Sequence, residues 1–140
     1  MIVSAEEFYY LCHSSNREEY CRVSSDTASA EVWLDILKKY PEKYMQDNVL
    51  YNSNLPLGVL YVLAEDDDEN VRCDIAGREY LDDYLIKKLM KDPDENVRGK
   101  LAYNSLLTKE QLEMLAQDSS EWVSNRAKDA LMDLSVTDKQ

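Results

Sequence analysis

The chain has 140 residues, a length that suits a single domain able to bury a continuous core without disulfides or a structural metal. Only three Gly and three Pro interrupt it, and apolar residues recur in threes and fours, which favours helices and argues against an all-β protein. With 28 Asp and Glu against 16 Lys and Arg, the net charge of -12 disfavours binding to nucleic acid or anionic membranes and favours a cationic partner, although solubility alone also explains such acidity.

The cysteines and the N-terminal segment bear on the compartment. Cys12, Cys21 and Cys73 form neither a CxxC pair nor an even set, so neither a zinc site nor a disulfide framework is predicted. No window approaches the roughly 20 apolar residues that a membrane span requires, and no basic region precedes an apolar stretch at the start. We therefore expect a cytoplasmic protein without a cofactor or metal.

The first segment, residues 1–30, is predicted to be a helical cap. Ser4 and Glu7 have the spacing of a capping box, in which the two side chains satisfy backbone N–H groups at a helix start. A second short helix is expected around residues 17–23, and the SSDTAS stretch at 24–29 is expected to connect it to the rest of the chain.

The remainder of the chain is repetitive. The segments LAEDDDENVRCDIA, LMKDPDENVRGKLA and LAQDSSEWVSNRAK begin at Leu63, Leu89 and Leu115, which defines a 26-residue register. A degenerate fourth copy precedes them. Residues 31–133 are therefore interpreted as about four repeats, and residues 134–140 as a tail, within one domain that spans 1–140.

Each repeat is predicted to contain two short amphipathic helices. The first helices are expected to begin near Pro56, Asp82 and Thr108, and the second to cover residues 70–76, 96–102 and 122–130. The valines of one column are expected to be buried: Val71, Val97 and Val123. Helices this short cannot form a stable core in pairs, so the pairs are predicted to stack into a right-handed α-solenoid with a 26-residue period.

The repeats LAEDDDENVRCDIA and LMKDPDENVRGKLAYNSLL resemble those of the leucine-rich repeat variant and of short HEAT-like α-solenoids, over residues 31–133. The resemblance implies an α-solenoid that serves as a binding scaffold, although a few such proteins act on DNA. Some bacterial proteins of this appearance resemble immunity partners of secreted toxins. The chain departs from iron–sulfur members of the family by lacking their cysteine cluster, and from DNA-acting members by lacking a basic face.

The acidic loops have a partial calcium-binding pattern. Asp66, Asp68 and Asn70 have the spacing of the first three ligands of a calcium loop, but the Gly and Glu required further along are missing. We interpret these acidic residues as caps of the following helix.

Three basic side chains receive structural interpretations. Arg72 and Arg98 occupy one column beside acidic residues, so ion pairs that are solvated or that join successive repeats are expected there, in preference to a functional anion site. His13 is the only histidine and is interpreted as a helix-capping or surface residue. No catalytic group is predicted.

Three aromatic residues are candidate anchors for a partner. Tyr61, Tyr84 and Trp122 fall in columns that the other regular repeats fill with polar or small residues, which predicts exposed side chains. The degenerate copy weakens the pattern, because it places Val32 in the Tyr84 column and Tyr44 in the Trp122 column. End-capping is the alternative role for Trp122.

The predicted partner-binding surface combines these aromatics with loop carboxylates: Tyr61, Tyr84, Trp122, Asp66, Asp67, Asp68, Asp92 and Asp94. Aromatic anchors and complementary charge are typical of protein interfaces. The sequence therefore predicts a non-catalytic module that holds a basic protein, one form of which is a toxin-neutralising inhibitor. A HEAT-like DNA-processing enzyme and a general scaffold or accessory protein are the alternatives.

Overall fold

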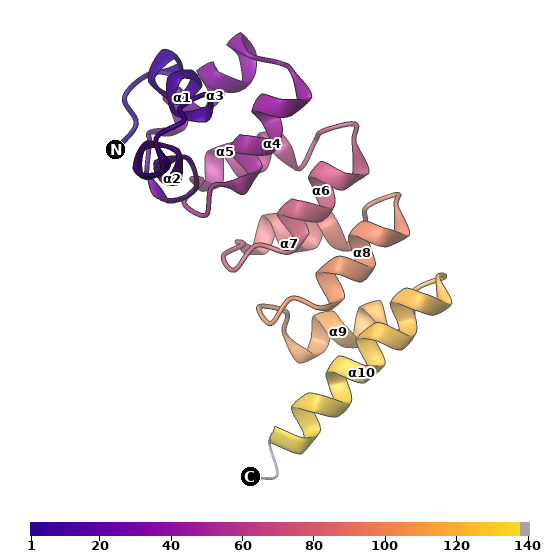
Figure 1. The fold of residues 1–140 in the computed structure, drawn as a ribbon. Coiled ribbons are helices and arrows are strands. Elements are labelled where there is room, and N and C mark those ends of the chain that lie inside the picture. The colour runs from indigo at the N-terminus through magenta and orange to yellow at the C-terminus, as the bar shows by residue number, and fades with distance from the viewer. Residues whose placement is uncertain (138–140) are drawn as a thin grey trace. The chain divides into compact units, whose positions relative to one another are not determined.

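A computed structural model describes residues 1–137, in which ten helices and no strands are present (Figure 1). The all-α prediction is confirmed. No helix in this range is long and apolar enough to cross a membrane. The chain divides into two compact units, Met1–Val62 and Leu63–Gln140, which are described separately.

The first unit is built around α1. Its helices are α1 (Ala5–Cys12), α2 (Arg17–Ser25), α3 (Ala30–Lys39), α4 (Lys43–Tyr51) and most of α5 (Leu57–Leu63). Helix α1 packs against α2, α3 and α4. In the core of this unit the rings of Phe8 and Trp33 meet edge to face with centroids 5.3 Å apart, and Trp33 is fully buried. The aromatic pair therefore stabilises the contact between α1 and α3.

The predicted capping box at the start of α1 is half formed. The Ser4 hydroxyl accepts a hydrogen bond from the Glu7 N–H, but the Glu7 carboxylate reaches one residue further back and accepts from the Val3 N–H. His13 is the C-cap of α1, in agreement with its expected capping role. The predicted second helix extends to Ser25, so two serines of the expected connection belong to α2.

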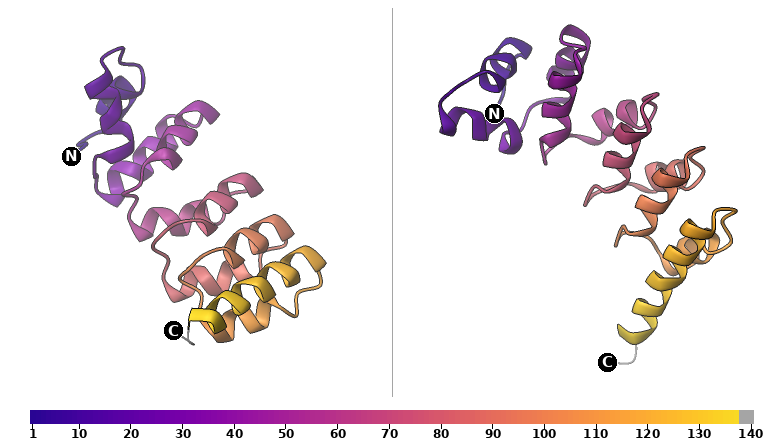
Figure 2. Two further views of the ribbon diagram at one scale, coloured as in Figure 1. Left: turned by 60° about the horizontal axis from the view of Figure 1, so that its bottom comes forward. Right: turned by 45° about the vertical axis from the view of Figure 1, so that its right-hand side comes forward.

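The second unit is built around α8. Its helices are α6 (Glu69–Ala76), α7 (Asp83–Met90), α8 (Glu95–Ala102), α9 (Lys109–Leu115) and α10 (Glu121–Thr137). Helix α8 packs against each of the other four, and α6, α8 and α10 lie in one row (Figure 2). Helices α7 and α9 are thus both held by α8.

Side-chain caps fix where these helices begin. Asp68 and Asp94 each accept the backbone N–H two residues ahead, as expected for caps of α6 and α8. Thr108 and Gln111 form a capping box at the start of α9, where a helix was predicted to begin. Each cap satisfies an N–H group that the helix itself leaves unpaired.

The predicted end of the last helix is wrong. Helix α10 continues from 130 to Thr137, because the segment LMDLSVT contains no Gly or Pro to end it. Residues 134–137 of the predicted tail are therefore helical, and residues 138–140 lie outside the described part of the chain.

Helix positions in the second unit recur at a constant interval. Helices α6, α8 and α10 begin at Glu69, Glu95 and Glu121, so their starts are evenly spaced along the chain. The third residue of each is a fully buried valine, Val71, Val97 or Val123, which confirms their predicted burial.

Candidate functional site

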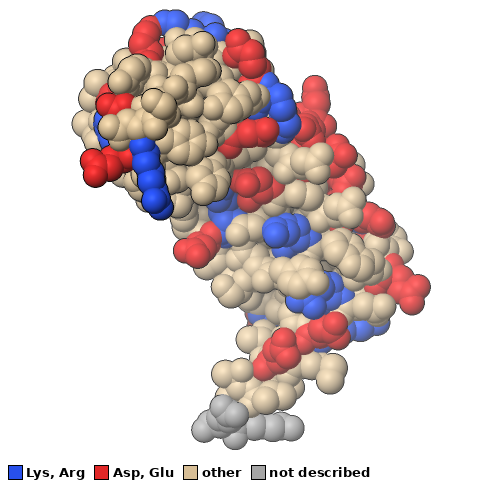
Figure 3. Space-filling model, in the orientation of Figure 1, with Lys and Arg blue, Asp and Glu red and all other residues tan. Residues whose placement is uncertain are grey.

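Three loops that contain acidic residues lie along one edge of the second unit, which we call the acidic edge. They are residues 64–68, 91–94 and 116–120, which precede α6, α8 and α10. Figure 1 and the right-hand view of Figure 2 both show these loops side by side. Acidic side chains gather along the same edge in Figure 3, with basic side chains on the face beside it.

Arginines of α6 and α8 form two arginine–aspartate pairs of the same geometry with these loops. Arg72 binds the carboxylate of Asp92 through Nε at 2.8 Å and Nη2 at 3.2 Å, and Arg98 binds Asp118 at 2.8 and 3.0 Å. Hydrogen bonds from Arg98 also hold the pKa of the Asp118 carboxyl below its usual range. The predicted ion pairs of Arg72 and Arg98 with acidic residues are present, and the buried Asp92 presents no free carboxylate to a partner.

The other predicted acidic residues have mixed roles. The Asp66 carboxylate accepts the Asp68 N–H at 2.9 Å, while Asp68 and Asp94 are half-buried caps. Asp67 has an exposed side chain. Sequence reasoning predicted the capping role, but it could not tell which aspartates stay exposed, because each is simply an aspartate in an acidic loop.

The glutamates at the helix starts are exposed, and the sequence analysis missed them as candidates. Glu69, Glu95 and Glu121 each occupy the first position of a helix beside the acidic edge. Their identity across three repeats was the signal that could have singled them out.

Trp122 lies at this edge and packs against a glycine of α8. It is the second residue of α10, and its side chain is 46% exposed. A Cβ atom at Gly99 of α8 would overlap the indole ring, so the ring packs directly against the α8 backbone. One side of the indole is thereby fixed while much of the ring remains accessible, an arrangement suited to an interface anchor.

Tyr84, the other predicted anchor in the second unit, does not lie beside Trp122. Tyr84 is 59% exposed but is the second residue of α7, which places it at the opposite end of that helix from loop 91–94, about 10 Å away along the axis. Tyr61 is 37% exposed and belongs to the first unit. The predicted exposure of all three aromatics is confirmed, whereas their common role in binding stays a prediction.

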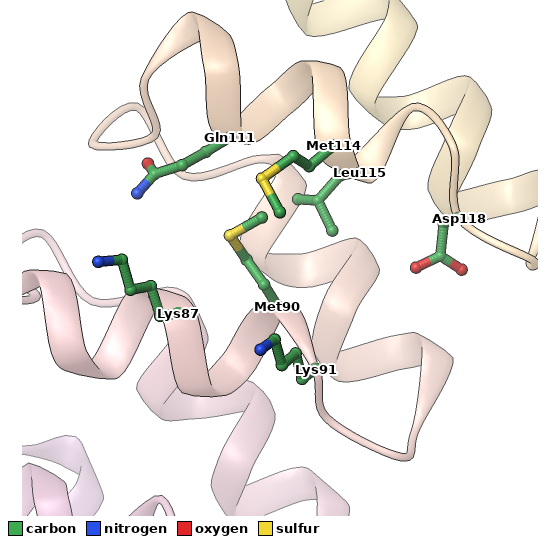
Figure 4. A pocket seen from close by; sticks show the side chains of 7 residues that line it. All are labelled: Lys87, Met90, Lys91, Gln111, Met114, Leu115 and Asp118. Atoms are coloured by element: carbon green, nitrogen blue, oxygen red, sulfur yellow. The ribbon is translucent and has the colours of Figure 1, made fainter.

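An apolar hollow of about 310 Å³ lies between α7 and α9 (Figure 4). Met90 and Met114 point toward one another across it, and Leu115 completes the apolar lining. Lys87 and Lys91 border it on the α7 side. The sequence analysis did not identify this hollow, because its walls come from two helices that lie apart in the sequence.

The first unit has an exposed aromatic cluster. Tyr9 stacks on His13 and on Tyr40, with centroids 4.2 and 4.8 Å apart, and His13 meets the edge of Tyr44. The neighbouring Cys12 is buried, which raises the pKa of its thiol to about 12 and keeps it protonated at neutral pH. The cluster therefore presents aromatic surface without a reactive thiolate.

The partial calcium pattern has a structural use. Asp66 and Asp68 accept backbone N–H groups, and within residues 1–137 no group of three His, Cys, Asp or Glu side chains is placed to hold a metal ion.

Comparisons with family models, curated proteins and solved structures find no match to this chain.

Proposed function

We propose that the protein is a short HEAT-like α-solenoid that binds a basic protein at the acidic edge of its second unit. The repeat architecture is supported by the even spacing of helix starts, the buried valine in each, and the two equivalent arginine–aspartate pairs. Binding without catalysis is one way to neutralise a toxin, so an immunity-type inhibitor is a specific form of this proposal.

The observation that carries the proposal is the pairing of an aromatic anchor with exposed carboxylates. Trp122 packs on α8 from the start of α10, and these two helices present Glu95 and Glu121 at their first positions. A large aromatic side chain contributes strongly to affinity once a partner excludes water from it. The surrounding carboxylates attract a basic protein and favour its correct orientation.

The DNA-processing alternative requires a cationic groove and is less well supported. On α7, Lys87 pairs with Asp83 at 2.7 Å, and Lys88 pairs with Glu65 at 2.5 Å. These carboxylates offset the positive charge that a phosphate backbone would need.

The test is affinity capture from the native cell, followed by binding measurements with the purified partner. We expect a basic protein whose Kd rises at least about 30-fold for Trp122→Ala, the effect of losing an anchor worth about 2 kcal/mol. Trp122→Phe should retain most of the affinity and controls for loss of folding. Tyr103→Ala is the matched aromatic control: Tyr103 is 57% exposed at the C-cap of α8, the opposite end of that helix from Glu95, so its loss should change the Kd less than about twofold. Equal binding by Trp122→Ala and wild type, or an acidic partner, would overturn the proposal.

A further inference from the structure

The hollow between α7 and α9 has the composition of a small-ligand site. Its lining from Met90, Met114 and Leu115 is apolar, and methionine side chains adapt readily to the shape of a bound molecule. Its volume of about 310 Å³ lies at the small end of the range for ligand pockets.

The polar groups around the hollow can donate to an anion. Lys87 is paired with Asp83, but both side chains are about two-thirds exposed, so water and a ligand compete easily for that contact. The exposed Lys91 forms no ion pair within residues 1–137. Gln111 uses its carbonyl oxygen in the cap of α9, and Figure 4 shows its amide group at the same end of the hollow as Lys87.

Among residues 1–137, the acidic side chain that borders the hollow is Asp118, and it is already neutralised. Asp118 lies at the end away from Gln111 in Figure 4, and Arg98 holds both of its carboxylate oxygens. The hollow therefore combines an apolar floor with the ammonium groups of Lys87 and Lys91 at its border, in a chain whose net charge is -12.

We propose that the hollow between α7 and α9 binds a single-chain amphiphile with a carboxylate headgroup, such as a medium-chain fatty acid. The headgroup lies between Lys87 and the Gln111 amide, with Lys91 adding positive charge on the same side of the hollow, and the alkyl chain lies over Met90 and Met114. The eight-residue α7 is about 12 Å long, which is close to the length of an extended alkyl chain of roughly ten carbons. It is too short for a docked protein helix, because stable protein interfaces bury about 800 Å² per partner. This inference does not depend on the acidic edge.

The experiment is a titration of the full chain, labelled with ¹³C at its methionine methyl groups, with decanoate below its micelle concentration. The five methionines give one site-specific reporter each. We expect saturable shifts of the Met90 and Met114 methyl resonances, while the buried Met45 in the first unit and the exposed Met132 stay unchanged. Decanol and decyltrimethylammonium, which keep the chain but change the headgroup, should bind at least about fivefold more weakly.

Substitutions separate a headgroup contact from general apolar adsorption. Lys87→Gln and Lys91→Gln should each raise the Kd for decanoate by about threefold to fivefold, whereas the exposed Lys128→Gln, away from the hollow, should leave it unchanged. The proposal is overturned if decanoate gives no saturable shift, if all exposed methionines respond alike, if the three probes bind equally, or if both variants at the hollow bind like wild type.

Discussion

Arg72 donates hydrogen bonds to both carboxylate oxygens of Asp92, which belongs to the next acidic loop along the chain. The same guanidinium also donates to the Asp66 carbonyl oxygen at 2.7 Å, so it joins the loop before α6 to the loop before α8. The side chains of Arg72 and Asp92 are only 13% and 6% exposed. Because neither charge is well solvated, each depends on the other far more than the partners of a surface ion pair do.

Removing one member of this pair should destabilise the second unit. We expect Asp92→Ala to lower the free energy of unfolding by about 3 kcal/mol, because it leaves the Arg72 guanidinium nearly buried without its carboxylate. Urea unfolding followed by circular dichroism measures the change. Asp67→Ala, in an exposed loop position, should cost less than about 0.5 kcal/mol. Equal stability of the two variants would contradict the assigned role of the pair.

The Arg98–Asp118 pair should make stability depend on pH. Hydrogen bonds from Arg98 lower the pKa of Asp118 in the folded state, so the ionised carboxylate stabilises the fold above the unfolded-state pKa of about 4. That contribution is lost as the pH falls through the lower, folded-state pKa. Asp118→Asn should therefore be less stable than wild type at pH 7, and the difference should shrink below about pH 4. A difference in unfolding free energy that stays constant down to about pH 3 would contradict this linkage.

Two helical glycines should respond oppositely to substitution. A Cβ atom at Gly99 would overlap the Trp122 ring, whereas a Cβ atom at Gly58 has only the Ala30 Cβ nearby, at 3.8 Å. Gly99→Ala is expected to cost about 1–3 kcal/mol and to shift Trp122 fluorescence as the ring is displaced. Gly58→Ala should be neutral or stabilise the protein by up to about 1 kcal/mol, because alanine is the better helix former. Thermal unfolding and tryptophan emission of both variants check the contrast.

Much of the second unit could be predicted because its contacts repeat with the sequence. The register of the repeats aligns Val71 with Val97 and Arg72 with Arg98, and residues at equivalent positions adopt equivalent burial and pairing. The caps followed from the side-chain chemistry of Asp68 and of the other loop residues that can accept a backbone N–H.

The rest depended on contacts that the register does not contain. Gly99 and Trp122 occupy different columns of the repeat, so their packing is specific to α8 and α10. The hollow between Met90 and Met114 likewise depends on how far α7 and α9 are held apart by α8, a distance that no column of the alignment reports. The sequence could thus predict repeated contacts, but not those formed once.

The acidic edge should act mainly on the rate of association. A triple variant, Glu69→Gln, Glu95→Gln and Glu121→Gln, removes three exposed charges at the starts of α6, α8 and α10. We expect association with a captured basic partner to slow about tenfold at low salt, because long-range attraction is weakened, and dissociation to change less than about twofold. The difference from wild type should narrow at physiological salt, where the Debye length is about 8 Å.

A matched change at a capping aspartate separates this effect from a loss of stability. Asp94→Ala also removes a negative charge from the edge, but it deletes the side chain that accepts the Asn96 N–H and should cost about 1 kcal/mol of folding stability. The triple glutamine variant loses the favourable contact of each glutamate with its helix N-terminus, about 0.3–1 kcal/mol per residue and so about 1–3 kcal/mol in total. Asp94→Ala therefore has a loss of stability at the lower end of that range but removes one charge instead of three. Stopped-flow association at two salt concentrations, with unfolding measured on the same samples, distinguishes the two. If the triple variant associates at the wild-type rate at low salt, the acidic edge does not steer a partner.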